Sequence, residues 1–100
     1  MPTNIVVRDY SEPDWPAVCD VHDNAHPIEI SSFAPKESSK PMSEVAQADG
    51  FFDGQQYVAC VKEKVVGFIC IEKEELSWLY VHPDFHRQGI GRSLVDHVRP

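Results

Sequence analysis

The sequence of 100 residues contains only three cysteines, Cys19, Cys60 and Cys70. They are odd in number, share no C-x-x-C spacing and lie inside apolar segments. This pattern is typical of small buried side chains in a reducing compartment, and not of disulfides or metal ligands. We therefore expect neither a disulfide framework nor a metal site built on cysteine.

Long apolar runs and a basic surface are also missing. The longest apolar run, around Val65 to Ile71, is far too short to cross a bilayer, and the N-terminal residues Met1 to Asn4 are polar, unlike a secretory leader. The formal net charge of −7 argues against broad contact with nucleic acid or with an anionic membrane face. These absences predict one soluble, cytoplasmic domain over residues 1–100, with no nucleic-acid or membrane partner.

The charge is unevenly distributed along the chain. Residues 81–100 hold three arginines against two aspartates, whereas residues 1–80 hold six basic against fourteen acidic side chains. Because opposite charges attract, we expect an anionic ligand to prefer the C-terminal fifth and a cationic ligand to prefer the rest.

Hydrophobic periodicity predicts an alternation of strands and helices. Apolar and β-branched runs indicate strands, and apolar residues at helical spacing indicate helices. The predicted order is a strand at 5–10, a helix at 13–24, an irregular segment at 25–54 with one short helix at 42–48, strands at 56–62, 65–71 and 76–81, and a helix at 89–98. This order is typical of an α+β fold, with helices packed on a mostly antiparallel sheet of about four strands.

The segment from Leu79 to Val98 carries the strongest functional signal. An apolar strand runs into a polar loop, the turn Gly89-Ile90-Gly91 and an amphipathic helix. The first four amides of a helix lack intrahelical partners, and glycines let phosphate oxygens approach the backbone. Arg87 and Arg92 flank the turn and can add charge-assisted contacts. A G-x-G turn alone is equally explained by a plain tight turn, but in this setting it predicts a pyrophosphate site.

The same segment resembles the acyl-coenzyme A binding motif of the Gcn5-related N-acetyltransferase (GNAT) superfamily. In that motif Arg or Gln is followed by two residues, Gly, one residue, and Gly or Ala. This chain reads His86-Arg87-Gln88-Gly89-Ile90-Gly91, with His in the leading position, and Leu79-Tyr80-Val81-His82-Pro83 matches the family's fourth strand.

The resemblance implies a GNAT-like three-layer α+β fold. It implies acetyl-CoA as co-substrate and transfer of an acyl group to a primary amine of a small molecule or protein. Coenzyme A would then be bound by the fourth strand and the following turn, through Leu79, Tyr80, Val81, Arg87, Gln88, Gly89, Ile90, Gly91 and Arg92.

Acyl transfer needs a base for the ammonium and a donor for the developing oxyanion. We expect the donor among the backbone N–H groups of 79–81. Glu75 and His82 are candidate bases, although a solvated turn acid and a surface histidine explain them as well. Glu29 could attract a cationic amine or be a plain surface acid. His22 and His26 lie four residues apart, as metal ligands on a helix can, but without a third ligand at a fitting spacing we expect a solvated helix end and no metal.

Members of this family continue with a fifth strand, a fourth helix and further strands, for which we find no counterpart in the sequence. We therefore expect only the N-terminal half of the domain, and no residue occupies the motif position of the tyrosine that protonates the thiolate.

The fourth strand would then be an apolar edge, with Leu76, Trp78 and Tyr80 on one face and Leu79 and Val81 on the other. Such an edge predicts a homodimer or higher assembly. The alternative to an acetyltransferase is thus a non-catalytic half-domain that binds acyl-CoA or oligomerises.

Overall fold

The structure is a computed structural model that describes residues 4–99, with Lys36 described by its backbone alone. The polar Met1 to Thr3, on which the expectation about a leader partly rests, lie outside these residues. The strands are β1 (Ile5–Asp9), β2 (Gln55–Val61), β3 (Lys64–Glu72) and β4 (Glu75–Val81), and the α-helices are α1 (Trp15–Ile30), α2 (Met42–Val45) and α3 (Ile90–Val98).

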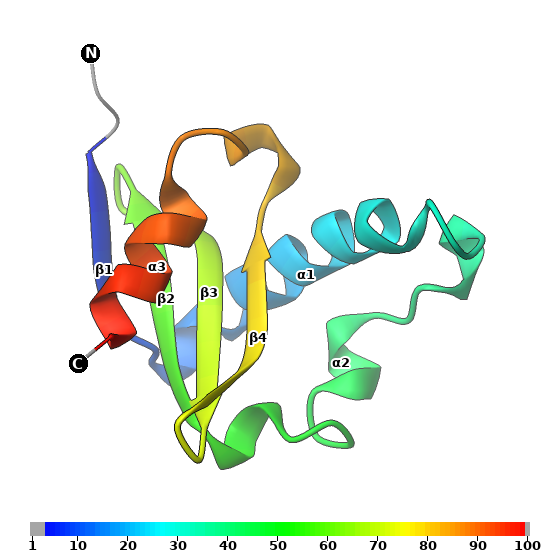
Figure 1. Cartoon of the computed structure of the whole chain (residues 1–100), viewed down its shortest axis with the longest axis horizontal. Helices are drawn as coiled ribbons and strands as arrows, with labels where there is room; N and C mark the ends of the chain where they lie inside the picture. The colour runs from blue at the N-terminus through cyan, green and yellow to red at the C-terminus, as the bar shows by residue number, and fades with distance from the viewer. Residues whose placement is uncertain (1–3, 100) are drawn as a thin grey trace.

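The four strands form one sheet with the order β1-β2-β3-β4, and every neighbouring pair is antiparallel. Helix α3 covers one face of the sheet, and α1 lies on the opposite face (Figure 1). The molecule therefore has three layers, which confirms the predicted α+β architecture with helices on an antiparallel sheet. Among residues 4–99, no helix has the length and apolar character needed to cross a bilayer.

Each face of the sheet has its own hydrophobic core. On the α3 face, Ile90 and Leu94 pack on Val66 and Ile69 of β3. The core on the α1 face is larger and centres on Phe51, which is fully buried. Its ring meets other aromatic rings edge-on or tilted, with centroids 5.2–6.1 Å apart, from Tyr10, Trp15, Phe52, Phe68 and Trp78. The α1 face is therefore the aromatic side of the sheet.

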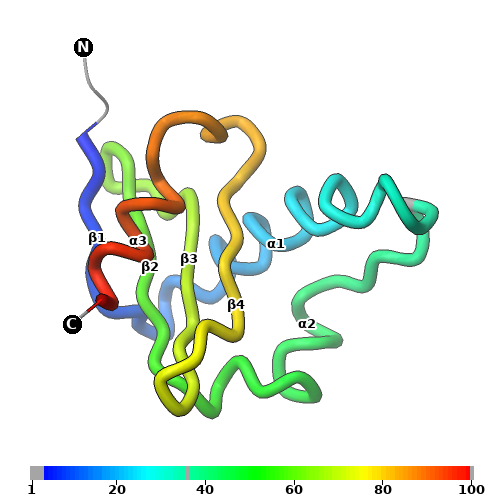
Figure 2. Tube along the Cα trace, viewed as in Figure 1, coloured from blue at the N-terminus to red at the C-terminus, as the bar shows by residue number. Residues whose placement is uncertain are grey.

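Helix α1 is longer than predicted, because it ends at Ile30 and not near Asn24. It continues through Pro27, which lacks an amide hydrogen and so omits one helical hydrogen bond. Ala25 and Ile30 are both buried, so packing sustains the last turns of the helix. As a result the end of α1 and the connection that follows it project past β4 (Figure 2).

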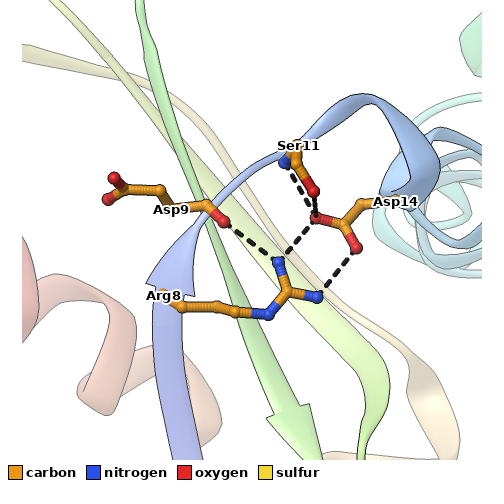
Figure 3. Close-up of polar contacts among 4 residues, drawn as sticks. All are labelled: Arg8, Asp9, Ser11 and Asp14. Atoms are coloured by element: carbon orange, nitrogen blue, oxygen red, sulfur yellow. Dashed lines mark hydrogen bonds and ion pairs between the residues drawn. The ribbon is translucent and has the colours of Figure 1, made fainter.

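The start of α1 is fixed to β1 by an ion pair. The guanidinium of Arg8 donates to both carboxylate oxygens of Asp14, at 2.7 and 2.8 Å, and the amide of Ser11 donates to the same carboxylate at 2.9 Å (Figure 3). The hydrogen bond from Arg8 holds the pKa of Asp14 down at about 2. The turn between β1 and α1 is thereby held in one geometry.

Strand β4 contains a bulge that changes which side chains share a face. Cys70 of β3 lies opposite Trp78, but the next residue, Ile71, lies opposite Leu76, so Ser77 is an extra residue. Leu76 therefore lies on the α3 face with Ile71, while Trp78 and Tyr80 face α1. The prediction that Leu76 shares a face with Trp78 and Tyr80 is wrong, because strict alternation does not survive a bulge.

Candidate functional site

The first component of the site is the outer edge of β4. Strand β4 is the last strand in the sheet order of the described residues, so one of its edges pairs with β3 and the other does not pair with a strand. The amide of His82 donates to the carbonyl of Val66 on β3 at 2.8 Å. Because backbone groups alternate in direction along a strand, Leu79 and Val81 direct their N–H and C=O groups to the outer edge. These are two of the residues predicted to contact coenzyme A.

The second component is the loop that joins β4 to α3. A short 3-10 turn, Pro83–Phe85, begins the loop, and the amide of Asp84 donates to Nδ1 of His82 at 3.1 Å. Further along, Nε2 of His86 donates to the carbonyl of Val81 at 2.9 Å. The residue in the leading position of the motif thus ties the loop to the end of the strand.

The third component is the start of α3, where the backbone takes two left-handed residues. Arg87 has φ 66° and Gly89, the residue that caps the helix, has φ 81°. The first bond within the helix runs from the amide of Ser93 to the carbonyl of Gly89, at 3.0 Å. The four amides of residues 89–92 therefore have no partner within the helix. They form a cradle of N–H groups at the positive end of the helix dipole.

The cradle is open and lies against the end of β4. A Cβ added to Gly89 would meet no heavy atom within 4 Å, so a phosphate oxygen can reach this backbone. A Cβ added to Gly91 would lie 3.9 Å from Cγ2 of Val81. The end of β4 and the amide cradle are thus neighbours, and the residues present fit a pantetheine arm joined to a pyrophosphate.

Gly67 on β3 sets how closely α3 approaches the sheet. A Cβ at this position would lie 3.1 Å from Cγ2 of Ile90 and 3.3 Å from Cδ1 of Leu94. The absence of a side chain lets the first turns of α3 press onto the sheet, which places the cradle beside β4.

Two arginines flank the cradle, as the sequence predicted. Both Arg87 and Arg92 are exposed, and Nε of Arg92 lies 3.7 Å from the carboxylate of Asp96 along the helix. Both partners of this pair are exposed, so the pair contributes little to stability and can rearrange toward an anion. Gln88 lies in the same turn, between the two left-handed residues.

The fourth component is a cavity of about 370 Å³ on the α1 face of β4. Helix α1, strand β4, the connection after α1, and α2 with the residues after it supply the walls. The cavity is lined by His22, His26, Ser38, Lys40, Val45, Asp49, Ser77, Trp78 and Tyr80. The strand that carries the proposed coenzyme A contacts therefore also forms a wall of a separate cavity.

Tyr80 joins the cavity to the end of α1. Burial, followed by the carboxylate of Glu29, raises the pKa of Tyr80 to about 12. The phenol is therefore protonated at neutral pH and acts as a hydrogen-bond donor, not as an anion. Glu29, predicted to lie in a loop, is in fact on the last turns of α1.

The two candidate bases lie at opposite ends of β4, Glu75 at its start and His82 just after its end. Glu75 begins the strand, opposite Glu72 at the hairpin with β3, and it is exposed. His82 follows the strand, with its Nε2 3.8 Å from a carboxylate oxygen of Asp20 on α1 and its Nδ1 3.8 Å from one of Asp84. The structure thus brings His82, and not Glu75, to the loop and cradle.

Sequence reasoning missed the cavity and the part that His22 plays in it. His22 is buried against β4, not on a solvated helix end as expected, because α1 continues past it. The apolar spacing that placed His22 in line with Val18 and Ala25 was the available signal. Among residues 4–99, no group of three or more His, Cys, Asp or Glu side chains is arranged to hold a metal ion.

Comparison with known proteins connects this geometry to one family. The family model of the acetyltransferase (GNAT) domain matches residues 52–99, the segment from β2 through α3. The chain is 26% identical over 101 residues to the uncharacterized N-acetyltransferase YafP of Escherichia coli K12, covering 92% of this chain and 63% of YafP. The chain thus spans less than two thirds of the length of that relative.

Two solved structures share the fold. A GCN5-related N-acetyltransferase from Rhodopseudomonas palustris superposes with a TM-score of 0.81 at 19% identity, covering 98% of this chain and 66% of that one. The PaiA N-acetyltransferase from Thermoplasma acidophilum, solved in complex with coenzyme A, gives a TM-score of 0.76 at 16% identity, covering 94% and 69%. The matched domain model, the curated relative and the shared fold agree on the segment that holds the β4 edge and the cradle, and in this segment the chain is similar to GCN5-related N-acetyltransferases.

Proposed function

We propose that the chain is an acetyl-CoA-dependent N-acetyltransferase domain, in one unit over residues 1–100, that acylates a primary amine. One observation carries the proposal: the outer edge of β4 ends beside the open amide cradle of α3. A thioester ligand with a pyrophosphate needs both surfaces, in this order. Coenzyme A bound to the fold neighbour PaiA supports the same ligand class.

Each part of coenzyme A has a matching surface. The pyrophosphate fits the amides of residues 89–92, and Arg87, Gln88 and Arg92 stand around it. The pantetheine arm fits the outward backbone groups of Leu79 and the outward N–H of Val81, whose carbonyl accepts from His86. The thioester end of the ligand would lie at Leu79, the outward residue farther from the cradle.

The acceptor amine fits the cavity on the α1 face of the same strand. Trp78 and Tyr80 wall this cavity, and Asp49 also lines it. Glu29 lies beside Tyr80, so carboxylates stand near the cavity and would attract a cationic amine. The acyl group and the amine would then approach β4 from its edge and from its α1 face.

In this arrangement the backbone of β4 has a chemical part in the transfer. Attack by the amine moves negative charge to the thioester oxygen, and an outward amide of residues 79–81 can donate to it. Holding both reactants on one strand supplies the proximity that the reaction needs. Of the two bases predicted from sequence, His82 lies at the coenzyme A end of β4, and Glu75 lies at the far hairpin.

The unpaired edge of β4 favours a second reading, a half-domain that assembles through this edge. Under that reading a second copy adds a strand to β4, giving a homodimer or higher assembly. Sedimentation velocity at micromolar concentration separates the readings: a single monomeric species would contradict assembly through β4.

Acetyl-CoA binding tests the main proposal directly. At about 100 times Kd, the ligand would stabilise the fold by about 2.7 kcal/mol, which raises Tm by roughly 10 °C for a domain of this size. Release of the coenzyme A thiol in the presence of a panel of primary amines then tests turnover. No thermal shift at saturating acetyl-CoA would overturn the proposal, whereas a shift without thiol release would favour the non-catalytic reading.

A further inference from the structure

Two histidines of α1 stack inside the cavity on the α1 face of β4. The rings of His22 and His26 are nearly parallel, at 14°, with centroids 4.9 Å apart. Nδ1 of His26 contacts the hydroxyl of Ser39 at 2.6 Å. Both side chains line the cavity, but only 2% of the surface of His22 is exposed.

The hydrogen bond at Nδ1 fixes the tautomer of His22. Nδ1 lies 3.0 Å from Oδ1 of Asp23, and the same oxygen accepts the amide of Met42 at 2.7 Å. An ionised carboxylate can only accept, so Nδ1 carries the hydrogen. In neutral His22 the lone pair is therefore on Nε2.

Nε2 of His22 is not fully enclosed, although the side chain as a whole is buried. Within residues 4–99, no fully enclosed side-chain nitrogen or oxygen is without a hydrogen-bond partner. Among these described residues, the His22 ring makes its hydrogen bond with Asp23, through Nδ1 and not through Nε2. Nε2 therefore borders the cavity that the ring lines, as a proton acceptor held by a rigid helix.

His22 also lies where the two reactants would meet. Its ring centroid is 6.1 Å from the ring of Trp78 and 5.0 Å from that of Tyr80, the two residues on either side of Leu79. The outward backbone of Leu79 is the surface proposed to hold the thioester end of the ligand. An amine in the cavity would thus stand between Nε2 and this part of β4.

We propose that His22 is the general base that deprotonates the acceptor ammonium and that Asp23 is its positioning residue; this inference rests on the proposed acetyltransferase function. Nε2 takes one proton from the ammonium, which leaves a neutral amine. The amine nitrogen then bonds to the thioester carbon as the carbon–sulfur bond breaks. The second amine proton goes to the departing thiolate, and the His22 imidazolium returns its proton to solvent.

The charged and titratable groups around His22 come from every neighbouring element. Helix α1 supplies Asp23, His26 and Glu29, and strand β4 supplies Tyr80, which interacts with Glu29. The connection after α1 and the residues after α2 add Lys40 and Asp49 to the cavity. Asp23 is the acid in direct contact with the ring, through the hydrogen bond at Nδ1.

The tautomer is a test that needs no turnover. We would label the chain with ¹⁵N-histidine and record long-range ¹H–¹⁵N correlation spectra at pH 8. These spectra should show His22 protonated at Nδ1 and unprotonated at Nε2. A hydrogen on Nε2 would overturn the proposal, because that nitrogen could not accept a proton.

Kinetics test the role itself, with acetyl-CoA and the most reactive amine of the panel as probes. The variant His22→Asn keeps a side-chain donor for Asp23 but has no basic nitrogen. We expect kcat to fall by about 100-fold or more and the acidic limb of the pH profile of kcat/KM to disappear. The matched control His26→Asn removes the other imidazole of the same cavity. It should retain the acidic limb of the pH profile of kcat/KM.

The variant Asp23→Asn tests whether Asp23 positions His22 for catalysis. Its amide oxygen can still accept from Met42 and His22, so the fold is retained while the charge is lost. We expect kcat to fall by roughly tenfold with KM for acetyl-CoA unchanged.

The outcomes separate the two hypotheses. If His22→Asn shows wild-type turnover and an unchanged pH profile of kcat/KM, the proposed role of His22 as general base is wrong. The proposed acetyltransferase function would still hold. Acetyl-CoA binding without any wild-type turnover would overturn both the transferase and its base.

Discussion

His86 and Val81 are joined across the β4–α3 loop by a hydrogen bond from Nε2 to the backbone carbonyl, 2.9 Å long. The bond connects the leading residue of the glycine motif to the strand that the motif follows. It holds the loop in the conformation that presents the cradle amides and occupies the outward carbonyl of Val81.

Replacing His86 with alanine should therefore weaken acetyl-CoA binding. One hydrogen bond of this kind contributes about 0.5–1.5 kcal/mol, so we expect Kd to rise roughly 2- to 10-fold in isothermal titration calorimetry. His97→Ala, near the other end of α3, is the control and should leave Kd unchanged. Equal affinity for His86→Ala and the wild type would show that the loop holds its shape without this bond.

The two glycines of the motif should respond oppositely to alanine. Gly89 has φ 81°, so Gly89→Ala introduces about 1–2 kcal/mol of backbone strain although its Cβ has open space around it. Gly91 lies in the first turn of α3, where Gly91→Ala adds a methyl group at ordinary contact distance, 3.9 Å from Val81, and should stabilise the helix by about 0.5–1 kcal/mol. Urea unfolding of both variants gives the two signs, and equal destabilisation would contradict this assignment.

Gly67→Ala should loosen the contact between α3 and the sheet. The new Cβ would lie 3.1 Å from Cγ2 of Ile90 and 3.1 Å from the carbonyl oxygen of Tyr80. Overpacking of this kind lowers the free energy of unfolding by about 1–3 kcal/mol. The double variant Gly67→Ala/Ile90→Ala removes the clashing methyl group, so its loss should be smaller than the sum of the two single losses. Strict additivity in urea unfolding would rule out the contact with Ile90 as the cause and leave the contact with the carbonyl of Tyr80.

The ion pair between Arg8 and Asp14 should make stability depend on pH in the acid range. The pKa of Asp14 is about 2 in the folded chain against a usual 3.8, so the folded state binds this proton more weakly than the unfolded state. The contribution is complete above about pH 3.8 and is lost as the pH falls through about 2. Asp14→Asn should lower the free energy of unfolding by about 1–3 kcal/mol at pH 7 and flatten its slope between pH 4 and 2.

Denaturant titrations at pH 7, 4 and 2.5 measure this dependence. Glu12→Gln, an exposed acid in the same turn, is the matched control and should keep the wild-type slope. A steep slope retained in Asp14→Asn would assign the acid sensitivity to other carboxylates.

The sequence predicted which helices and strands form more accurately than it predicted where they end and which face each side chain occupies. Strands β2 to β4 and helix α3 lie within one or two residues of their predictions, because each is a short apolar run with clear turn residues beside it. The last turns of α1 were missed because Pro27 is a local signal for an ending, while the burial of Ala25 and Ile30 is a property of the tertiary structure.

The candidate site was predictable only where it is local. The glycine turn and the strand before it are one continuous segment, so the cradle could be predicted from residue order. The cavity brings His22 of α1 against Tyr80 of β4, which are 58 positions apart in the printed sequence, and no spacing rule connects them. The bulge at Ser77 has no signature in the spacing of apolar residues. Simple alternation along the strand therefore assigned Leu76 to the wrong face.

The bulge at Ser77 also limits how β4 can add strands. A regular edge offers an uninterrupted row of donors and acceptors, and such a row templates aggregation. Here the row is broken at Ser77, so only the stretch 78–81 keeps a regular repeat on the outer edge. The acidic residues Glu74 and Glu75 stand at the other end, where charge opposes further pairing. The edge is thus open to a short, register-defined contact and resistant to indefinite fibre growth.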